Sequence, residues 1–351
     1  MKAANSKQGA NGKSRAPGVK DVAKAAGVSV ATVSRAFNLP HTVSEEARKL
    51  VLEVAKGLGY RPNPAAKALR LQRTFMVGAV FPTTDYGFYA RLLSTFQGEM
   101  SRAGYLSVLL TVGFDNSRIF DSVRQLVERG VEALMIVGRI DDPRLLAFLL
   151  DSGIPVVCTY SALKDAPFPS IGIDNYAATA AVMRHLLELG HREFAMLSGP
   201  AAGNDRQQAR RKAFRDALAA AGIVGTPRIF EEPQGYSLEY GVRAFHTVVE
   251  QHPEVTALVC NSDGYGMAAI LEARRVGIRV PEQLSITGFD NQEFAALLDP
   301  PLTTISVKAD AMGVGAARAL LQALQHGQPA ESEELEATLI VRGSTGKPPR
   351  K

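Results

Sequence analysis

One short glycine motif is the part of the chain whose residue types and spacing most directly suggest chemistry. Gly264-Tyr-Gly266-Met-Ala-Ala269 matches the pattern G-x-G-x-x-A and lies between a strand-like run and a helix-like run. In dinucleotide-binding folds such glycines follow the first strand directly, and an acidic residue closes the next strand about 20 residues on. Here Asn261-Ser-Asp263 intervenes, and Asp290 lies 24 residues beyond Gly266. Helix capping by Ser262 or Asp263, with close packing at the glycines, explains the motif equally well.

No other catalytic or metal-binding pattern stands in the sequence. It has no G-x-x-x-x-G-K-[ST], G-x-S-x-G or H-E-x-x-H, and its six His share no metal-ligand spacing. His191, just past Gly190, is expected to interact with a helix C-terminus. Cys158 and Cys260 lie in apolar runs, and we expect them to be reduced core residues. We therefore predict no catalytic residues, no metal, no cofactor and no enzyme activity.

Charge is distributed unevenly along the 351 residues. Residues 1–73 contain 14 Lys and Arg against 4 Asp and Glu, whereas the remaining chain has 26 against 31. A basic beginning on a mildly acidic body is the electrostatic pattern of a protein that binds a polyanion. For residues 1–17, which lack apolar periodicity, the alternative of a solvated, disordered basic tail is favoured.

Two absences set the expected location. No run approaches the ~18–20 apolar residues that a membrane span requires. The polar N-terminal stretch has no apolar centre of the kind found in secretory signals. We expect a soluble, cytoplasmic protein with no membrane partner.

Three short helices are predicted after the tail. The first places Val22, Ala23 and Ala26 on one face and ends at Gly27. The second runs from Val30 to Asn38, with Ser29 as its N-cap and Val33 and Phe37 pointing inward. The third begins at Ser44, and its expected apolar stripe consists of Ala47, Leu50, Val51, Val54 and Leu58. Such an arrangement, with a Gly-containing turn between the first two helices, is a helix-turn-helix unit.

A further short helix is predicted from Asn63, a good N-cap, and Pro64, which suits the first helical position. Only about two turns are available before Thr74, and so short a helix is marginal alone in water. We expect it to form when something else supports it.

From Phe75 onward strands alternate with helices at about 25–30 residues per unit, which favours parallel sheets covered by helices. Helical patterns are predicted at Tyr89–Ala103, Thr179–Leu189, Gln207–Ala221 and Gly264–Val276. The predicted strands are Val77–Phe81, Leu106–Thr111, Ala133–Val137, Val156–Thr159, Phe194–Ser198, Arg228–Glu231, Ala257–Cys260, Ser285–Gly288 and Thr304–Val307. Nine strands are many for one open sheet, so we predict two stacked α/β subdomains with a cleft between them.

The run from Val19 to Asn38 (VKDVAKAAGVSVATVSRAFN) resembles the DNA-binding head of the lactose-repressor (LacI/GalR) family nearly residue for residue. The resemblance covers about residues 18–344. It continues through Val43-Ser-Glu-Glu, Leu58-Gly-Tyr60-Arg-Pro-Asn63, Ala66-Lys-Ala-Leu69, Gly153-Ile-Pro-Val-Val, Ile173-Asp-Asn, Leu187-Glu-Leu-Gly-His-Arg, Gly288-Phe-Asp290, Asp299-Pro-Pro-Leu-Thr-Thr-Ile305 and Val341-Arg-Gly-Ser.

For the head, the resemblance implies that the second helix enters the DNA major groove. Val30 and Ala31 could then make only apolar contacts, for example with a thymine methyl group, and Arg35 could pair with a guanine edge or a phosphate. The phosphate-binding candidates are Ser29, Thr32, Ser34 and Asn38. Ser34 as a helix-packing residue is the alternative.

For the hinge, the DNA-binding candidates are Asn63, Lys67, Leu69 and Arg70. Leu69 matches the leucine that the family wedges into the minor groove, which kinks the duplex, while Lys67 and Arg70 would lie by phosphates. Leu69 could also pack on the second hinge helix of a dimer. Since this helix is marginal alone, DNA could order it and subdomain motion could disorder it.

For the body, the resemblance implies a periplasmic-binding-protein-like core that closes on a small effector. Matching the family's pocket positions selects Phe88, Tyr89, Asn204, Arg206, Arg210, Tyr236, Ser262 and Asp290. Asp290 suits sugar hydroxyls or an amine, and the two arginines suit hydroxyls or an anionic group. Arg210 as a structural ion pair is the alternative.

The chain departs from the family's sequence at several of these pocket segments. Tyr86-Gly-Phe-Tyr89 replaces the family's usual Asn-Pro-Phe-Phe, and Arg210-Arg-Lys-Ala-Phe214 replaces its Arg-x-x-Gly-Phe. Ser262 replaces the Asn of the family's Asn-Asp motif, and Asn291 replaces the second Asp of its Gly-x-Asp-Asp motif. The basic stretch Arg206–Arg215 favours an acidic ligand, such as a sugar acid or a phosphate.

These observations predict a transcriptional regulator, a repressor, that binds double-stranded operator DNA as a homodimer, with a tetramer possible, and responds to a small effector. The expected divisions are a tail (1–17), a helix-turn-helix domain (18–62), a hinge (63–74), a core (75–344) and a second tail (345–351). Within the core, one subdomain would comprise about 75–173 and 305–327, and the other about 174–304 and 335–343. A periplasmic-type solute-binding protein and a nucleotide-dependent α/β enzyme are the alternatives.

Overall fold

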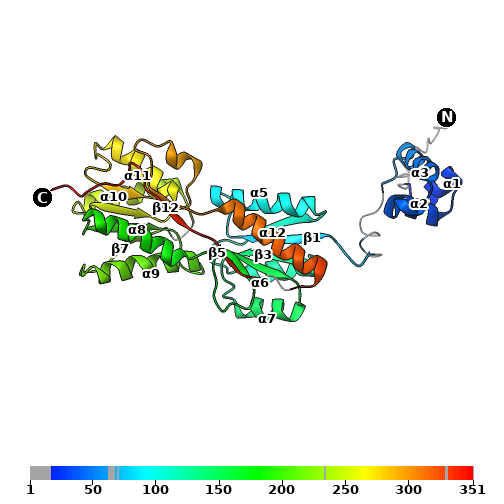
Figure 1. Cartoon of the computed structure of the whole chain (residues 1–351), viewed down its shortest axis with the longest axis horizontal. Helices are drawn as coiled ribbons and strands as arrows, with labels where there is room; N and C mark the ends of the chain where they lie inside the picture. The colour runs from blue at the N-terminus through cyan, green and yellow to red at the C-terminus, as the bar shows by residue number, and fades with distance from the viewer. Residues whose placement is uncertain (1–16, 62–67, 69–70, 233–234, 329–330, 351) are drawn as a thin grey trace, which may run out of the picture. The chain divides into compact units, whose positions relative to one another are not determined.

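The chain consists of two compact units, residues 1–74 and residues 75–351. The computed structural model describes residues 17–61, 68, 71–232, 235–328 and 331–350. Figure 1 colours the first unit blue and the second from cyan to red. The finer divisions expected from the sequence stay predictions.

The described part of the first unit is a three-helix head. Its elements are α1 (Val19–Ala26), α2 (Val30–Asn38), the 3-10 turn η1 (Pro40–Thr42) and α3 (Glu45–Gly57). Gly27 ends α1 in the left-handed region at φ 67°, where glycine has no Cβ to clash. Ser29 and Ser44 cap α2 and α3 through their side chains. The core of the head is small and apolar and consists of Val22, Ala23, Ala26, Val33, Ala36, Val51 and Ala55.

The apolar stripe expected on the third helix was partly wrong. Val51 and Ala55 are buried, whereas Leu50 is 44% exposed and Leu58 39% exposed. An α-helix has 3.6 residues per turn, so Val51 and Ala55, about one turn apart, lie on the same face of the helix. Leu50, the residue before Val51, points to the side of that face. Phe37, expected to point inward, is half-buried and packs edge-on against Tyr60 at 5.7 Å.

The core begins with a parallel sheet in the order β11-β5-β4-β3-β1-β2. Its strands are β1 (Met76–Phe81), β2 (Leu106–Thr111), β3 (Ala133–Val137), β4 (Val156–Ser161), β5 (Ser170–Ile173) and β11 (Glu333–Glu334). The accompanying helices are α5 (Gly87–Arg102), α6 (Ile119–Glu128), α7 (Pro143–Ser152) and α12 (Ala309–His326). We call this the first subdomain. Its central strands are buried on both faces, which explains their continuous apolar sequence.

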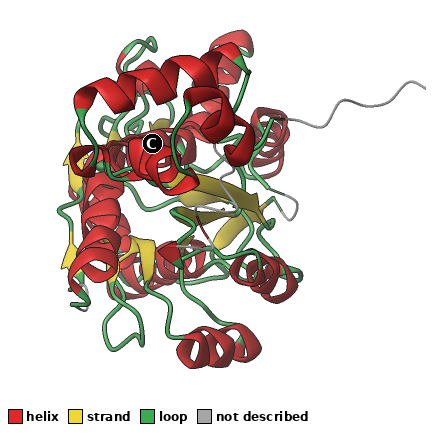
Figure 2. Ribbon diagram, turned by 90° about the vertical axis from the view of Figure 1, so that its right-hand side faces the viewer, coloured by secondary structure: helices red, strands yellow, loops and turns green. Residues whose placement is uncertain are grey.

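A second parallel sheet has the order β7-β6-β8-β9. Its strands are β6 (Phe194–Ser198), β7 (Arg228–Glu231), β8 (Ala257–Cys260) and β9 (Ser285–Thr287). The helices of this second subdomain are α8 (Asn175–Leu189), α9 (Asp205–Ala220), α10 (Leu238–Gln251) and α11 (Asp263–Arg275). Figure 2 shows one group of strands at the centre of the view and further strands at its left edge, with helices around them. The predicted fold class, a helical head followed by an α/β core with parallel sheets, is confirmed.

The chain returns between the subdomains through a two-stranded antiparallel ribbon. β10 (Thr304–Ser306) pairs with β12 (Thr338–Ile340), and the 3-10 turn η2 (Glu293–Ala296) precedes β10. The sequence had placed Thr304–Val307 among the parallel strands. It had also missed β5, β11 and β12, which are short and carry little apolar alternation for a pattern to detect.

After β12 the chain lies against the second subdomain. Ser344 accepts a hydrogen bond from Thr303 N at 2.8 Å and donates one to Ile286 O at 2.6 Å. His191 is fully buried beneath this segment, with Nε2 2.9 Å from Gly346 O and 3.0 Å from Ser285 Oγ, and Nδ1 2.9 Å from Thr256 Oγ1. The segment thereby contacts β9, the residue before β10 and the histidine that follows α8.

Candidate DNA-binding face and candidate ligand pocket

The start of α2 is shaped by two hydroxyl groups. Ser29 has extended backbone angles, and its Oγ accepts a hydrogen bond from Thr32 N at 3.0 Å. The Ser29 and Thr32 hydroxyl oxygens lie 2.8 Å apart. The predicted N-cap is confirmed. Because both residues retain free lone pairs or protons beyond these bonds, the capping role leaves them able to meet a phosphate.

The outer side of α2 carries most of the side chains expected to read DNA. Val33 and Ala36 are buried in the head, whereas Val30 (43% exposed), Ala31 and Arg35 are exposed. Exposing a valine to water is unfavourable, so this face is consistent with a partner surface.

Two further residues of α2 are partly engaged within the helix. The side-chain Nδ2 of Asn38 donates a hydrogen bond to Ser34 O at 2.7 Å, which uses one of the two amide protons of Asn38. Ser34 itself is half-buried. The expected hinge residues Asn63, Lys67, Leu69 and Arg70 lie outside the described residues.

In the core, Asp290 is the centre of the expected pocket. It follows β9 in a loop with φ 100°, a left-handed conformation that is unfavourable for a residue with a Cβ, and it is only 4% exposed. Its Oδ1 accepts a hydrogen bond from the Tyr160 hydroxyl at 2.5 Å, and its Oδ2 accepts one from Tyr86. Burial raises the pKa of Asp290, although Arg210 and the two hydroxyl donors oppose that shift.

Arg210 projects from α9 and is fully enclosed. Its Nε and Nη2 donate to Asn175 Oδ1 at 2.9 and 2.8 Å, and its Nη1 donates to the Asn261 carbonyl at 3.0 Å. Nη2 also donates to the Tyr160 hydroxyl at 2.9 Å, and the guanidinium lies 3.4 Å from the centre of the Phe289 ring. Arg210 therefore has extensive hydrogen bonding within the protein.

Arg206, one turn earlier on α9, pairs with Asp205 at 2.8 Å and lies over the Tyr160 ring at 5.6 Å. Gly138 makes room for it, since a Cβ at that position would stand 2.0 Å from Arg206 Nη1. Further along, Arg211 pairs with Glu231 and Lys212 with Asp216. The positive charge that favoured an acidic ligand is thus largely neutralised by the protein's own carboxylates.

Two expected pocket residues are helix caps. Asn204 caps α9, accepting from Gln207 N at 3.4 Å, while its buried Nδ2 has no hydrogen-bond partner in the described part of the chain. Ser262 caps α11, accepting from Tyr265 N at 3.2 Å. At Gly266 a Cβ would stand 2.9 Å from Leu302 Cδ2. The glycine motif is therefore explained by capping and close packing, the structural alternative that the sequence left open.

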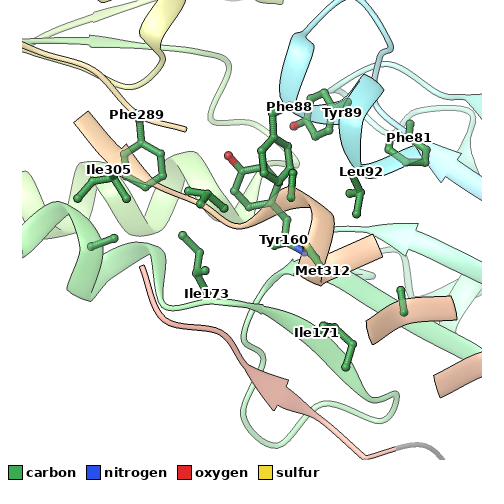
Figure 3. Packing of buried hydrophobic residues seen from close by; sticks show 14 of the residues in the cluster. Phe81, Phe88, Tyr89, Leu92, Tyr160, Ile171, Ile173, Phe289, Ile305 and Met312 are labelled. Atoms are coloured by element: carbon green, nitrogen blue, oxygen red, sulfur yellow. Dashed lines mark hydrogen bonds between the residues drawn. The ribbon is translucent and has the colours of Figure 1, made fainter. Parts of the chain in front are cut away.

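Aromatic rings fill the centre of the site. Tyr86 stacks on Tyr236 at 5.2 Å, and Tyr236 stacks on Tyr265 at 5.7 Å. Phe88, at the start of α5, contacts the Tyr160 ring at 4.3 Å, and Figure 3 shows the two rings packed together. Tyr89 lies beside Phe88 at 5.7 Å. The tyrosines form a layer that reaches from one subdomain to the other.

Two cavities lie near these rings. One cavity, of about 560 Å³, is lined by Thr83, Asp85, Tyr86, Phe114, Glu232, Tyr236, Glu239 and Arg243 among others. A second, of about 1100 Å³, is lined by residues that include Phe88, Arg91, Asp290, Gln292, Lys308 and Asp310. Neither includes Tyr89, Asn204, Arg206, Arg210 or Ser262 in its lining, and Arg206 lines a separate, much smaller cavity beside Phe114 and Gly203.

Sequence reasoning missed several residues that complete the site, namely Tyr160, Asn175, Gln207 and Asn261, and treated Tyr86 only as a departure from the family pattern. Tyr160 lies near the carboxyl end of β4, and the carboxyl ends of parallel strands face the ligand crevice in open α/β sheets. The position of Tyr160 near the end of a predicted strand could therefore have indicated a pocket residue from the sequence. The ligand-binding role of the whole set stays a prediction.

Other classes of site are not found in the parts of the chain that the structure describes. There, no cluster of three or more His, Cys, Asp and Glu could hold a metal ion. Likewise, none of the helices described is both long and apolar enough to cross a membrane.

Comparison with protein families identifies both units. Residues 18–63 match the family of bacterial regulatory proteins, lacI family, and residues 183–345 match a periplasmic binding protein-like domain. The transcriptional repressor PurR of Pectobacterium carotovorum is 31% identical over 335 residues, which cover 94% of this chain and 97% of PurR.

Solved structures agree with this match. A complex of the transcriptional regulator CelR with cellobiose has a TM-score of 0.67 at 28% identity, covering 93% of this chain and 99% of CelR. The Lac repressor dimer bound to operator and the anti-inducer ONPF has a TM-score of 0.82 at 24% identity, covering 95% of this chain and all of that one, and so shares the fold. The chain belongs to the lacI family of bacterial DNA-binding transcriptional regulators.

Proposed function

We propose that the protein is a repressor that binds a near-palindromic operator as a homodimer and changes its operator affinity when a small ligand binds between the core subdomains. Residues 18–62 would read the DNA and residues 63–74 would contribute the hinge. The observation that carries the proposal is the exposed face of α2, with Val30, Ala31 and Arg35 outward, in a segment that matches the lacI family model. A protein that binds operator DNA would act in the cytoplasm, because bacterial DNA lies there.

The DNA-reading roles follow from side-chain chemistry. Arg35 would donate to a guanine edge or a phosphate, and Val30 and Ala31 would contact a thymine methyl group. Phosphate contacts are assigned to Ser29, Thr32, Ser34 and Asn38 in the head and to Asn63, Lys67 and Arg70 in the hinge. Leu69 would wedge into the minor groove.

A dimer is supported by exposed apolar groups on an edge strand. Leu106 and Leu109 of β2, at the end of the first sheet, are 65% and 41% exposed. A second copy of the chain would bury such groups and protect the strand edge. A two-fold dimer also presents two heads to two symmetric half-sites. The Lac repressor, which shares the fold, is a dimer on its operator.

Ligand binding is proposed for the cleft that contains Asp290, Arg206, Arg210, Tyr236, Phe88 and Tyr89, with Asn204 and Ser262 at its helix starts. Asp290, Phe88 and Tyr236 support this assignment, because each of them lines one of the two cavities. CelR, at 28% identity, forms a complex with cellobiose. A regulator of this kind needs no catalytic group, and the helix-turn-helix head disfavours a solute-binding protein.

The operator is the first test. We expect a gel shift with the DNA upstream of the protein's own gene, whose affinity falls steeply between 50 and 200 mM salt because phosphate contacts release counterions. Leu69→Ala should weaken operator binding, while the melting temperature of the core and its response to ligand stay unchanged. Absence of a shift at moderate salt would contradict the repressor, and an equal loss of DNA and ligand binding in Leu69→Ala would contradict the wedge.

A further inference from the structure

A further cavity, of about 520 Å³, lies between the edge strand β7 and α10, both labelled in Figure 1. The described residues that line it belong to β7, to the residue that follows β7 and to α10, all in the second subdomain. Both cavities near the tyrosine layer also include residues of the first subdomain. Its volume falls in the range of ~300–1,000 Å³ that small-molecule sites occupy. We call it the outer cavity.

Tyr240 gives the outer cavity an unused hydrogen-bonding group. This residue lines the cavity and is only 9% exposed, and its ring packs edge-on against Tyr265 at 5.4 Å. The Tyr240 hydroxyl has no hydrogen-bond partner in the part of the chain that the structure describes. A buried hydroxyl is costly to leave unpaired, so a ligand that bonds to it gains free energy that the empty protein forgoes.

Two carboxylates lie near this hydroxyl. Burial raises the pKa of Tyr240, and the negative charges of Glu232 and Glu231 add to that increase. Both glutamates line the outer cavity as well. An ionised carboxylate can only accept hydrogen bonds, whereas a hydroxyl can accept one too. A ligand that bridges Tyr240 and Glu232 must therefore bring donors.

The charges around the outer cavity favour a cation. Arg211 pairs with Glu231, while the guanidinium of Arg243 stands 3.5 Å from Glu232 and 3.1 Å from Glu239. Three carboxylates thus share two guanidinium groups. The Arg243 side chain is 57% exposed, so it can turn into water when another cation takes its place beside Glu232. An anionic ligand would add to the excess of negative charge.

The rest of the lining suits an alkyl chain. Phe230 borders the cavity and packs edge-on against His252 at 5.9 Å, which orients its ring. Ala244 and Thr247 contribute methyl groups from α10. Aromatic rings attract a nearby cation, and small apolar groups pack against methylene groups.

We propose that the outer cavity binds an aliphatic diamine or a longer polyamine, with one ammonium group between the Tyr240 hydroxyl and the Glu232 carboxylate. The second ammonium group lies towards Glu231, and the methylene chain lies on Phe230. The site is separate from the ligand pocket of the cleft, and the proposal rests neither on the effector nor on the operator. Glu232 also lines the cavity of about 560 Å³, whereas Tyr240 does not, so Tyr240 carries the decisive variant.

The test is isothermal titration calorimetry of the full-length protein at constant ionic strength. The probes are 1,4-diaminobutane and spermidine, with 1,4-butanediol as the uncharged counterpart and succinate as the anionic one. The variants are Tyr240→Phe and Glu232→Gln. Glu250→Gln is the matched control, because it neutralises an exposed carboxylate of α10 that does not line the outer cavity.

We expect both amines to bind wild type and Glu250→Gln with affinities that agree within about twofold, and we expect no binding of the diol or of succinate. Tyr240→Phe should bind 1,4-diaminobutane about tenfold more weakly, and Glu232→Gln at least about tenfold more weakly, because each removes a bond to a charged group. The sequence has nine Tyr and no Trp, so the near-ultraviolet difference spectrum reports tyrosines alone. The amine should change this spectrum in wild type, and the change should shrink in Tyr240→Phe.

The contrary outcomes differ from one another. If neither amine binds wild type, the site is wrong. Binding of the diol or of succinate as tight as that of the diamine would overturn the cationic ligand. Amine binding that is unchanged in both Tyr240→Phe and Glu232→Gln would place the amine elsewhere on the protein. The melting temperature of Tyr240→Phe separates a structural role of Tyr240, because removing a buried, unpaired hydroxyl should leave the fold at least as stable as wild type.

Discussion

At the scale of single residues, position on a helix face decides what each side chain can do. α2 carries one cation, Arg35, and it lies on the exposed side of the helix, away from Val33 and Ala36 in the core of the head. Arginine presents several donors in a planar fork, which matches a guanine edge. A contact of this type carries sequence information that a phosphate contact does not.

Arg35→Ala should therefore weaken operator binding by about 5- to 150-fold, which corresponds to about 1–3 kcal/mol for a bidentate base contact. The matched control is Lys49→Ala, which removes an exposed cation of α3 that stands 3.8 Å from Glu45. Fluorescence anisotropy with operator and scrambled DNA measures both variants. Equal losses on the two DNAs in Arg35→Ala would show a phosphate contact instead of base reading.

At the scale of elements, the loop between β9 and η2 depends on one buried carboxylate of α11. Asp263 accepts from Thr304 Oγ1 in β10 and from Gln292 N, both at 2.5 Å. It thereby links the start of α11 to the loop that carries Asp290 and to the ribbon between the subdomains. Gly288 permits this approach, because a Cβ there would collide with Asp263 Oδ1.

Burial raises the pKa of Asp263 to about 8, against the opposing effect of the Thr304 hydrogen bond. A carboxyl group whose pKa is raised in the folded state holds its proton there at a pH where the unfolded chain has lost it. Stability is therefore lost as pH rises from about 4 towards about 8. Asp263→Asn should remove this contribution, so its free energy of unfolding relative to wild type should increase over that range. Urea denaturation at several pH values measures it, and a constant difference would contradict the raised pKa.

At the scale of the whole molecule, the segment after β12 ties the second subdomain together over His191. The imidazole is fully buried between Thr256, Ser285 and Gly346, and burial lowers the pKa of His191. A neutral, buried histidine is compatible with these partners, whereas a charged one would lack counterions among them.

Acidification should consequently destabilise the core. Because the pKa of His191 is lower in the folded state, the unfolded chain takes up a proton first, and stability falls as pH drops below about 6.5. His191→Gln should lower the melting temperature at pH 7.5 but show less further loss between pH 7 and 5 than wild type. His252→Gln, at a half-buried position of the same subdomain, is the control. An unchanged pH dependence in His191→Gln would contradict the assignment.

Local signals allowed much of the fold to be predicted from the sequence. Ser29 and Ser44 predicted the starts of two helices, Gly27 predicted the end of another, and apolar runs predicted the buried parallel strands. These features depend on interactions within a few residues. The head motif alone indicated the family, because its residues are contiguous in the chain.

The inside of the cleft was decided by tertiary structure. Tyr160 and Asp290 are 130 residues apart and Tyr86 and Asp290 are 204 apart, so no local pattern could pair them. The same holds for the arginines of α9. Their charge was visible in the sequence, but the pairing of Arg206 with Asp205 and of Arg211 with Glu231, and the hydrogen bonds of Arg210 to Asn175, were not. The sequence by itself determined that a helix-turn-helix head precedes a two-part α/β core. Only the packing of distant strand ends decided which hydroxyls face the carboxylate, because hydrogen bonds across a cleft depend on register and crossover geometry that the sequence does not display.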